Sequence, residues 1–589
     1  MTLPCKVLTI DLAKRSSYEE DRTDLFEKYL GGAGVATSLL LENCPEKADP
    51  LGPDNPIIFA VGPLTGLFPL ASKTVAMFKS PLTGNLGESH AGGRSAIAIR
   101  SSGYGAIVIK RASETPVYLA VHDGDVHFRD ASGVWGIDST VEVSKVIREL
   151  EGGAGIRTIM RIGGAGENLV SYACVTADTH RHFGRLGLGA VFGSKKLKAL
   201  VISGRKSIEV EDKKRYRDIY DEIYMEAVAS PLMWKYRDIG TAVNVSPLNA
   251  LRALPIMNLR NASLPDLEKM SGENLVGGYL GGRMACAHCP VGCVHIAALR
   301  EPHERDIYFY KTSMIPYDYE PIYSLGAMLG IFEIKDFLRL MDIVEAIGMD
   351  AISLGVTLAW ATEALERNLI SYKETFGLKF RWGDHKTYMK AVELIVRPPN
   401  EFYEALAKGV EYAASRYGGE DFALSFGSNE MPGYHTGPIC YVGYLTGSRH
   451  SHLDSGGYSL DQKILKEGIL PEPEKIAESL LKEEAWRQIL TSLVVCLFAR
   501  EIFDREVVIN TLGVSGIKVS GEDLYKIGME ILRNKFRFKL REGFEPKNLR
   551  IPHRILETET PLGKIDEGYL KKAVEQFFNL LQSDTSKPK

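Results

Sequence analysis

Hydrophobic residues in the first third of the chain alternate with polar ones or form short apolar runs, a pattern that predicts β-strands. The runs at 117–122 and 126–129 are separated by Asp123-Gly124, a dipeptide typical of a tight hairpin. A helix is predicted at 142–151. We therefore expect residues 1–208 to form a β-rich domain. Its predicted strands are 6–12, 56–61, 96–100, 106–110, 117–122, 126–129 and 201–204.

From about residue 209 the apolar spacing becomes helical, and glycines follow the ends of the periodic segments. We expect two mainly helical domains, residues 209–429 and 430–589, so the predicted fold class is α+β. The segment after residue 430 has no clear periodicity. The predicted helices are 213–229, two within 332–369 joined at 347–350, 403–417, 474–500, 521–536 and 566–582.

Composition and charge narrow the class of protein. The chain has 589 residues, 45% of them hydrophobic and 25% charged, as in a soluble globular protein. A net charge of −4 gives no electrostatic case for nucleic-acid or membrane binding, and no apolar run approaches the roughly 20 residues of a membrane-spanning helix. The start of the chain lacks the features of a signal peptide. Eight cysteines in this length do not form a disulfide framework, so we expect reduced thiols and a cytoplasmic location.

One short segment concentrates the candidate chemistry. Cys286, Cys289 and Cys293 follow a C-x2-C-x3-C spacing, and Pro290 and Gly292 favour the turns that would bring three thiols together. Thiolate ligands select zinc or an iron–sulfur cluster. The sequence leaves both alternatives open at this point.

The fourth ligand differs between the two alternatives. For zinc, His288 or His295 could complete the site, although no second C-x2-C pair follows downstream. A cubane cluster needs a further thiolate from a distant part of the chain, and Cys496 is the best candidate. The spacing is the reverse of the C-x3-C-x2-C found in radical enzymes that cleave S-adenosylmethionine.

Glycine-rich links connect the predicted strands at 92–93, 163–166 and 184–193. They match neither the phosphate-loop pattern nor the dinucleotide fingerprint. Turns are one interpretation. The basic residues near the last link, Arg185 and Lys195 among them, favour a second one, in which backbone N–H groups surround an anionic ligand.

Several stretches, taken in order, resemble the tungsten-containing aldehyde:ferredoxin oxidoreductase family. Each stretch alone is weak, but the ordered set is specific and covers nearly the whole chain. The stretches are residues 62–66, 79–84, 103–108, 164–168, 180–185, 193–199, the cysteine segment, 347–350 and 496–498.

The resemblance implies one tungsten atom, with molybdenum as the alternative, between two pyranopterin dithiolenes and beside a [4Fe–4S] cluster. It also allows a magnesium ion bridging the pterin phosphates. The second of the family's two D-x-x-G-L-(C/D) segments reads 491–496 here and has lost its Asp and Gly. The implied cluster ligands are Cys286, Cys289, Cys293 and Cys496. The implied pterin contacts are Lys73 (Arg in relatives), His90, Gly92, Gly93, Arg185, Gly187, Glu345 and Asp350.

The resemblance also implies a glutamate and a histidine near the metal. Glu320 falls at the glutamate position, whereas His450 and His452 compete for the second; His452 is favoured because an aliphatic residue follows it. Some relatives hold an iron between subunits with an E-x-x-H helix. The matching positions here are Arg339 and Asp342, so we expect no bridging iron, and any oligomer would use another surface.

The implied reaction oxidises a small aldehyde with water to a carboxylic acid. Electrons would leave through the cluster to ferredoxin or a small ferredoxin-like subunit. Glu320 would act as general base with a pKa raised by a dry pocket, and His452 would polarise the carbonyl or relay a proton. We expect this site where the first domain meets the helical ones. Two alternatives stay open: the same cofactors reducing an acid or activated acid, and a structural zinc-binding interaction protein.

Overall fold

The computed structural model describes residues 4–153, 155–303 and 306–583. Its first part is built from two six-stranded sheets, ordered β2-β1-β6-β3-β4-β5 and β11-β10-β9-β12-β7-β8. The first sheet comprises β1 (Lys6–Asp11), β2 (Ser16–Asp21), β3 (Ile57–Ala60), β4 (Thr74–Lys79), β5 (Leu86–Ala91) and β6 (Ala106–Lys110). The second comprises β7 (Val117–His122), β8 (Asp125–Asp130), β9 (Ile156–Arg161), β10 (Val175–Ala177), β11 (Arg181–Phe183) and β12 (Leu197–Gly204).

One hydrophobic core joins the two sheets. Ile10 and Phe59 of the first sheet pack in the same buried cluster as Leu119 and Leu200 of the second. The predicted hairpin at Asp123-Gly124 is confirmed, since β7 and β8 pair antiparallel across it. The helices of this part are α1 (Thr23–Tyr29), α2 (Gly32–Asn43), α3 (Ser95–Ser102), α4 (Thr140–Leu150), α5 (Gly164–Glu167) and α6 (Leu188–Ser194).

The strand predicted at 96–100 is wrong, because these residues lie in helix α3. Five alternating residues are too few to distinguish the period of a strand from that of a helix, and both faces of this segment are buried. The helix ends at Gly103, which has a φ of 103° and donates its N–H to the Arg100 carbonyl. A glycine at this position relieves the cost of the left-handed conformation.

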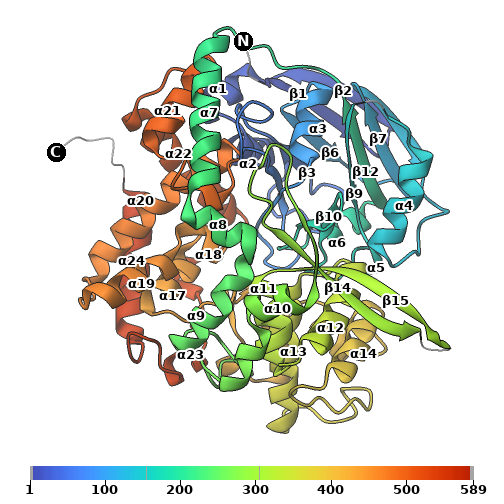
Figure 1. Cartoon of the computed structure of the whole chain (residues 1–589), viewed down its shortest axis with the longest axis vertical. Helices are drawn as coiled ribbons and strands as arrows, with labels where there is room; N and C mark the ends of the chain where they lie inside the picture. Colours follow the sequence, from blue (N-terminus) through green and yellow to red (C-terminus); the bar gives the residue numbers. More distant parts are fainter. Residues whose placement is uncertain (1–3, 154, 304–305, 584–589) are drawn as a thin grey trace.

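The rest of the chain is mainly helical and lies below and to the left of the sheets in Figure 1. The middle part contains α7 (Lys213–Ala229), α8 (Pro231–Asp238), α9 (Val245–Ala250), α10 (Gly272–Tyr279), α11 (Tyr319–Pro321), α12 (Ile334–Ile347), α13 (Ala351–Glu366), α14 (His385–Val396), α15 (Glu401–Leu406) and α16 (Val410–Tyr417). The last part contains α17 (Pro438–Thr446), α18 (His452–Ser455), α19 (Gly457–Glu467), α20 (Pro473–Ser492), α21 (Arg505–Val514), α22 (Gly521–Arg541), α23 (Arg554–Glu557) and α24 (Glu567–Gln582).

The α+β class is thus confirmed, as are the helix at 213–229 and the helix pair joined at 347–350. The single helix predicted at 403–417 is instead α15 and α16, broken at Gly409, whose φ is 96°. The helix predicted to reach residue 500 ends at Ser492. The division into domains at residues 208 and 429 stays a prediction.

A small antiparallel sheet interrupts the helices and was not predicted. It contains β13 (Leu280–Met284), β14 (Val294–His303) and β15 (Asp306–Tyr317), and a two-stranded ladder of β16 (Ser425–Phe426) and β17 (Asn429–Glu430) follows later. The sheet packs on α12: Arg339 pairs with Glu301 of β14 at 2.5 Å, and Asp342 accepts a hydrogen bond from Ser313 of β15. Arg339 and Asp342, which occupy the two positions of the family's E-x-x-H motif, therefore both have partners within this chain.

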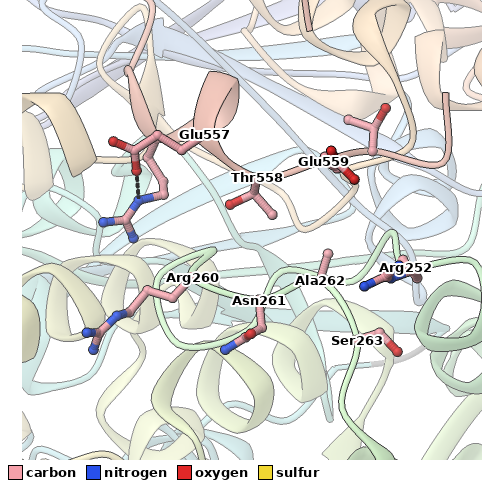
Figure 2. Close-up of a pocket in the computed structure, with 10 residues that line it drawn as sticks. Arg252, Arg260, Asn261, Ala262, Ser263, Glu557, Thr558 and Glu559 are labelled. Carbon is pink, nitrogen blue, oxygen red and sulfur yellow. Dashed lines mark hydrogen bonds and ion pairs between the residues drawn. The ribbon is translucent and has the colours of Figure 1, made fainter. Parts of the chain in front are cut away.

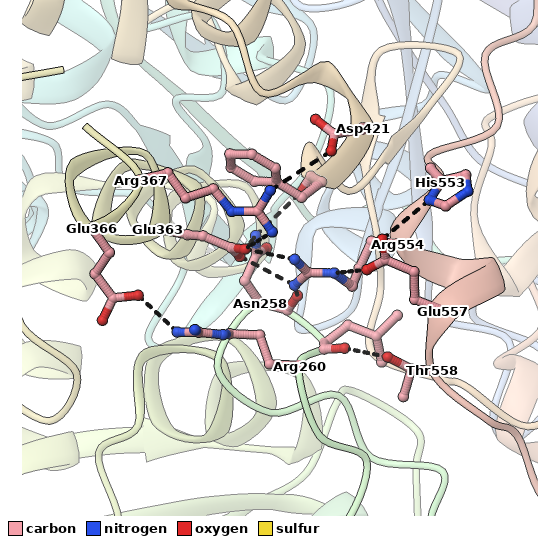
Figure 3. Close-up of polar contacts among 12 residues, drawn as sticks. Asn258, Arg260, Glu363, Glu366, Arg367, Asp421, His553, Arg554, Glu557 and Thr558 are labelled. Carbon is pink, nitrogen blue, oxygen red and sulfur yellow. Dashed lines mark hydrogen bonds and ion pairs between the residues drawn. The ribbon is translucent and has the colours of Figure 1, made fainter. Parts of the chain in front are cut away.

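A buried polar network fastens the C-terminal part to α13. Arg554 donates to Glu363 and to the carbonyl of Asn258, and both charged side chains are at most 5% exposed (Figure 3). Arg260 and Glu366 form a neighbouring pair that is at least 40% exposed on each side. Among the described residues, no helix is long and apolar enough to cross a membrane.

Candidate active site

The two cysteine-bearing segments meet at Leu70. The N–H of Cys496 donates to the Leu70 carbonyl at 2.9 Å, and the Leu70 N–H donates to the His288 carbonyl at 3.0 Å. The loop itself is closed by a hydrogen bond from the Cys289 N–H to the Cys286 carbonyl. One residue of the first part of the chain therefore fixes the fourth predicted ligand relative to the other three.

The charges around the thiols show that the four cysteines share one environment. Burial raises the pKa of Cys289 to about 11 and that of Cys293 to about 12, with Cys496 as the next cause in both cases. Burial would also raise the pKa of Cys286, but Arg181 and Lys73 outweigh it and hold that pKa below its ordinary value. Within the part of the chain that the structure describes, no three His, Cys, Asp or Glu side chains form a group that could hold a single metal ion.

Glycines allow the first sheet to approach the cysteine loop. A Cβ at Gly92 would lie 2.5 Å from the Cys286 Sγ, and Gly93 accepts a hydrogen bond from the Ala287 N–H at 2.9 Å. Gly93 has a φ of 95°, which further restricts the position to glycine. The predicted glycine pair thus lies against the predicted cluster ligands.

Arg181 is a candidate site residue that the sequence analysis did not single out. Its Nε is buried without a hydrogen-bond partner, and it lies 3.2 Å from the Cβ that Gly92 lacks. Its charge interacts with Cys286 and with Asp318. The signal available in the sequence was the dense polar run Asp-Thr-His-Arg-His at 178–182, directly after a buried strand.

Arg185 joins the first sheet to the helical part. It donates from Nε to Asp350 at 3.1 Å and from Nη2 to the Glu430 carbonyl at 2.8 Å, while its Nη1 is buried without a partner. Asp350 is also the N-cap of α13, where it accepts a hydrogen bond from the Ile352 N–H. Two predicted residues 165 positions apart are therefore in direct contact.

Glu345, which like Asp350 was predicted to contact the pterin, faces two histidines. His180 Nδ1 lies 3.3 Å and His182 Nε2 lies 3.0 Å from Glu345 Oε1. Burial alone would raise the pKa of this carboxyl, but the two imidazoles hold it well below its ordinary value. Glu345 therefore contacts the two residues that flank Arg181.

Three further predicted residues lie on the first part of the chain. Lys73 donates its backbone N–H to the Val494 carbonyl at 3.2 Å, in the segment that precedes Cys496. His90 Nε2 lies 2.7 Å from Glu88, and burial lowers the pKa of this imidazole. Gly187 has a φ of 86°, and a Cβ there would meet a backbone carbonyl at 2.1 Å.

Glu320 and His452 lie side by side. His452 Nε2 is 3.4 Å from Glu320 Oε1, and the Tyr434 hydroxyl donates to the same oxygen at 3.2 Å. The second nitrogen of His452, Nδ1, is buried without a partner. Burial would raise the pKa of Glu320, but the contact with His452 holds it below its ordinary value. The expectation of a raised pKa at Glu320 is therefore wrong.

The raised pKa belongs instead to Asp318, two residues earlier. Burial and then the charge of Glu320 raise the pKa of Asp318 to about 7, even with Arg181 close by. Asp318 nevertheless keeps accessible surface of its own. The sequence analysis missed this carboxylate because nothing in the sequence separates it from an ordinary surface aspartate.

His450 lies outside this group. Its Nδ1 is 2.9 Å from the Tyr444 carbonyl, and its Nε2 is 2.8 Å from Lys539 Nζ. Burial and the Lys539 charge lower the pKa of His450 to about 3. Its ring packs against Phe544. Both ring nitrogens therefore have partners in the interior of the C-terminal part, and the ring is held there by packing as well.

A separate polar cleft of about 460 Å³ lies between residues 252–263 and 554–560 (Figure 2). Arg252, Arg260 and Arg554 border it, together with Glu557 and Glu559. None of the predicted site residues lines this cleft. It borders the buried network of Figure 3, not the cysteines or the Glu320–His452 pair.

Comparison with known proteins places these features in one family. Residues 7–204 match the family model "Aldehyde ferredoxin oxidoreductase, N-terminal domain", and residues 218–588 match "Aldehyde ferredoxin oxidoreductase, domains 2 & 3". A tungsten-containing aldehyde ferredoxin oxidoreductase of Pyrococcus abyssi is 33% identical over 98% of this chain and 95% of its own. The WOR-like subunit of an aliphatic sulfonate oxidoreductase of Pyrococcus furiosus is 32% identical over 69% of this chain and 66% of its own.

Among solved structures, the active site complex BamBC of benzoyl coenzyme A reductase, in complex with 1,5-dienoyl-CoA, has the same fold. The TM-score is 0.84 at 20% identity, over 98% of this chain and 94% of that one. The fold and the full-length matches define an oxidoreductase. The chain belongs to the aldehyde ferredoxin oxidoreductase family, which leaves the structural zinc-binding interpretation without support.

Proposed function

We propose that this protein is a tungsten-dependent enzyme that converts an aldehyde and water to a carboxylic acid, two protons and two electrons. The position of Arg181 carries this proposal. A Cβ at Gly92 would lie 3.2 Å from Arg181 Nε and 2.5 Å from Cys286 Sγ, so the guanidinium lies beside the cysteine loop, and its charge also interacts with Asp318. The charge of Glu320 in turn raises the pKa of Asp318, so the thiols and the two carboxylates are linked by interacting charges.

The residues present fit a bis-pyranopterin with phosphate groups. Two buried polar atoms of the site, Arg181 Nε and Arg185 Nη1, lack partners and belong to cations suited to an anionic ligand. A bulky planar group needs close backbone approach, and Gly92, Gly93 and Gly187 each exclude a Cβ. We propose that these residues, with Lys73, His90, Glu345 and Asp350, would hold the cofactor, and that a magnesium ion would accompany its phosphates.

We further propose that Cys286, Cys289, Cys293 and Cys496 ligate one [4Fe–4S] cluster, since thiolates are the ligands of such clusters. When bound, these groups would supply a two-electron acceptor for the oxidation and a route for single electrons out of the protein. Tungsten follows from the named relatives, with molybdenum as the alternative metal. The first 208 residues would carry the pterin, and the two helical domains would carry the cluster.

The chain's own residues would handle the protons. Glu320 is positioned to remove a proton from the attacking water, and its contact with His452 keeps it ionised and able to do so. His452 would then carry the proton or polarise the aldehyde carbonyl. Tyr434 donates to the same Glu320 oxygen and fixes the carboxylate in place. The proposed electron acceptor is ferredoxin or a small ferredoxin-like subunit.

The direct test is an assay of the metal-loaded protein with a panel of aldehydes and oxidised benzyl viologen. We expect one carboxylate for every two viologens reduced, because each viologen accepts one electron. The reverse assay, with reduced viologen and carboxylic acids or their thioesters, tests the reductive alternative, which the likeness to a reductase favours. A metal-loaded protein that is active only in the reverse assay would overturn the proposed direction.

A further inference from the structure

A group of basic side chains surrounds the predicted cluster ligands at the protein surface. Four segments border the ligands: residues 92–94, 231–238, 283–293 and 496–500. Together they carry five lysine or arginine side chains and one acidic side chain, Asp238. The basic rim, as we call it here, consists of Arg94, Lys235, Arg237, Arg283 and Arg500.

Contacts place the members of the basic rim on either side of the cysteines. Arg94 follows Gly93, whose carbonyl accepts from the cysteine loop, and it is 55% exposed. Arg283 lies three residues before Cys286 and donates to the Asp238 carbonyl at the end of α8. These bonds connect the start of the cysteine loop to α8.

Helix α8 completes the surface on the side of Cys496. Tyr236 of α8 stacks on Phe498, two residues after Cys496, with a ring separation of 4.5 Å. Lys235 lies over the Tyr236 ring at 5.0 Å, and the charge of Arg500 reaches both residues. Trp234 on the same helix is 46% exposed. The surface beside Cys496 is therefore cationic with aromatic groups.

This local charge is opposite to that of the whole chain. The protein has 75 acidic and 71 basic side chains and a net charge of −4, whereas the four bordering segments hold five cations against one anion. Three members have acidic neighbours: Arg94 lies 3.8 Å from Asp178, Arg237 lies 3.3 Å from Asp238, and Arg500 lies 3.7 Å from Glu501. Asp238 and Glu501 are exposed, so these two pairs are screened, whereas Asp178 is buried beneath Arg94, which is itself 55% exposed. The five cations of the basic rim still outnumber these three anions.

We propose that the basic rim is the docking surface for a small acidic protein that carries a one-electron iron–sulfur centre. This inference rests on the proposed function and names the surface through which its electrons leave. In each encounter one electron would pass from the cluster to the oxidised centre of the carrier, so two encounters follow each aldehyde oxidised. Complementary charge raises the rate of such encounters, and added salt lowers it.

The test compares two electron acceptors with the same holoenzyme: an acidic [4Fe–4S] ferredoxin and the small dye benzyl viologen. In the double variant K235E/R237E on α8, we expect kcat/KM for ferredoxin to fall at least about tenfold, since charge-pair steering of this size is typical. The rate with the dye should stay unchanged, because a small acceptor does not need the rim. R94E, on the other side of the loop, should reduce the ferredoxin rate in the same way.

A matched control reverses two charges elsewhere. Lys482 and Lys571 lie on α20 and α24, are 60% and 66% exposed, and each pairs with a glutamate four residues away. K482E/K571E changes the net charge by the same amount as K235E/R237E. We expect it to leave both the ferredoxin rate and its salt dependence at wild-type values. A visible spectrum equal to wild type shows that each variant keeps its cluster.

Direct binding separates failure of this inference from failure of the proposed function. Titration calorimetry of ferredoxin at low salt should show binding to wild type and to K482E/K571E, and at least about tenfold weaker binding to K235E/R237E. If no aldehyde is oxidised but this pattern holds, the docking surface stands and the reaction is wrong. If K235E/R237E binds and reduces ferredoxin as well as wild type does, the docking surface is wrong.

Discussion

His452 Nε2 lies 3.4 Å from Glu320 Oε1, although 132 residues separate the two in the chain. The contact holds the carboxyl in its ionised form, because a nearby imidazole favours the negative charge. His452 leaves its Nδ1 buried without a partner, so that nitrogen is available to a substrate. The pair therefore combines a charged carboxylate with one ring nitrogen, His452 Nδ1, that has no hydrogen-bond partner.

The first prediction concerns catalysis. Glu320→Gln preserves the shape of the side chain but removes the base, so we expect kcat to fall roughly 10²–10⁴-fold with KM little changed. His452→Asn should cost less, because water can replace part of its role. Steady-state kinetics on protein of matched tungsten and iron content would measure both. Turnover by Glu320→Gln at a near wild-type rate would show that the base lies elsewhere.

His450→Asn should act mainly on stability. The substitution removes the ring that contacts Lys539 and the Tyr444 carbonyl, and an unsatisfied buried polar group costs about 1–3 kcal/mol. We expect a lower midpoint of urea unfolding and a smaller loss of kcat than in the two variants above. An inactive but fully stable His450→Asn protein would instead place this histidine in the reaction.

The pH dependence of kcat/KM should report the coupled carboxyls Asp318 and Glu320. The pKa of Asp318 is raised to about 7, so the pair gains its full negative charge only as pH rises through that value. Glu320 is already ionised at this pH, and the negative charge that Asp318 gains beside it makes Glu320 a stronger base, so activity should increase with pH around 7 and then level off. In Asp318→Asn, Glu320 loses a like charge but keeps His452, so the increase should move to lower pH. An unchanged profile would exclude Asp318 from the titrating pair.

The cysteine prediction uses spectroscopy. Cys496→Ala leaves three thiolates, so we expect the cluster to be lost or converted to a three-iron form, with a fall in broad visible absorption. Cys44→Ala is the control, because Cys44 is buried in a hydrophobic cluster of the first part of the chain. If the Cys496 variant keeps a full four-iron spectrum, another residue is the fourth ligand.

The stability prediction compares two ion pairs that lie close together in Figure 3. Arg554→Met leaves Glu363 buried without its main cation, and breaking a buried pair costs about 3–5 kcal/mol. Arg260→Met breaks an exposed pair with Glu366 and should cost about 1 kcal/mol or less. Urea unfolding followed by tryptophan fluorescence gives both values. Equal losses in the two variants would show that burial does not govern this network.

The sequence predicted those elements whose signals are local. The Asp123-Gly124 dipeptide identifies a hairpin within a few residues, and the helix at 213–229 follows from its own composition. Helix α3 was mistaken for a strand because its buried environment, rather than its own period, selects the conformation. The β14–β15 pairing was missed because no Asn-Gly or Asp-Gly dipeptide separates its strands.

The candidate site depends on contacts between distant segments, and the sequence alone does not contain them. The cysteine spacing indicated a metal or cluster site, but only the family resemblance joined Cys496 to it; the contact through Leu70 appears in the fold. Arg181 and Asp318 gain their importance from the charges that the fold places beside them, which no spacing rule encodes. Which of His450 and His452 faces Glu320 likewise depends on how the chain turns after Gly447.

The measurement that tests the central claim most directly is the metal content of the protein purified without oxygen. The account predicts one tungsten, or one molybdenum in its place, together with about four irons per chain, as one cubane cluster requires. Phosphate and pterin should be released on denaturation. Protein that contains zinc alone, or iron without any pterin after growth with tungstate and molybdate, would contradict the account.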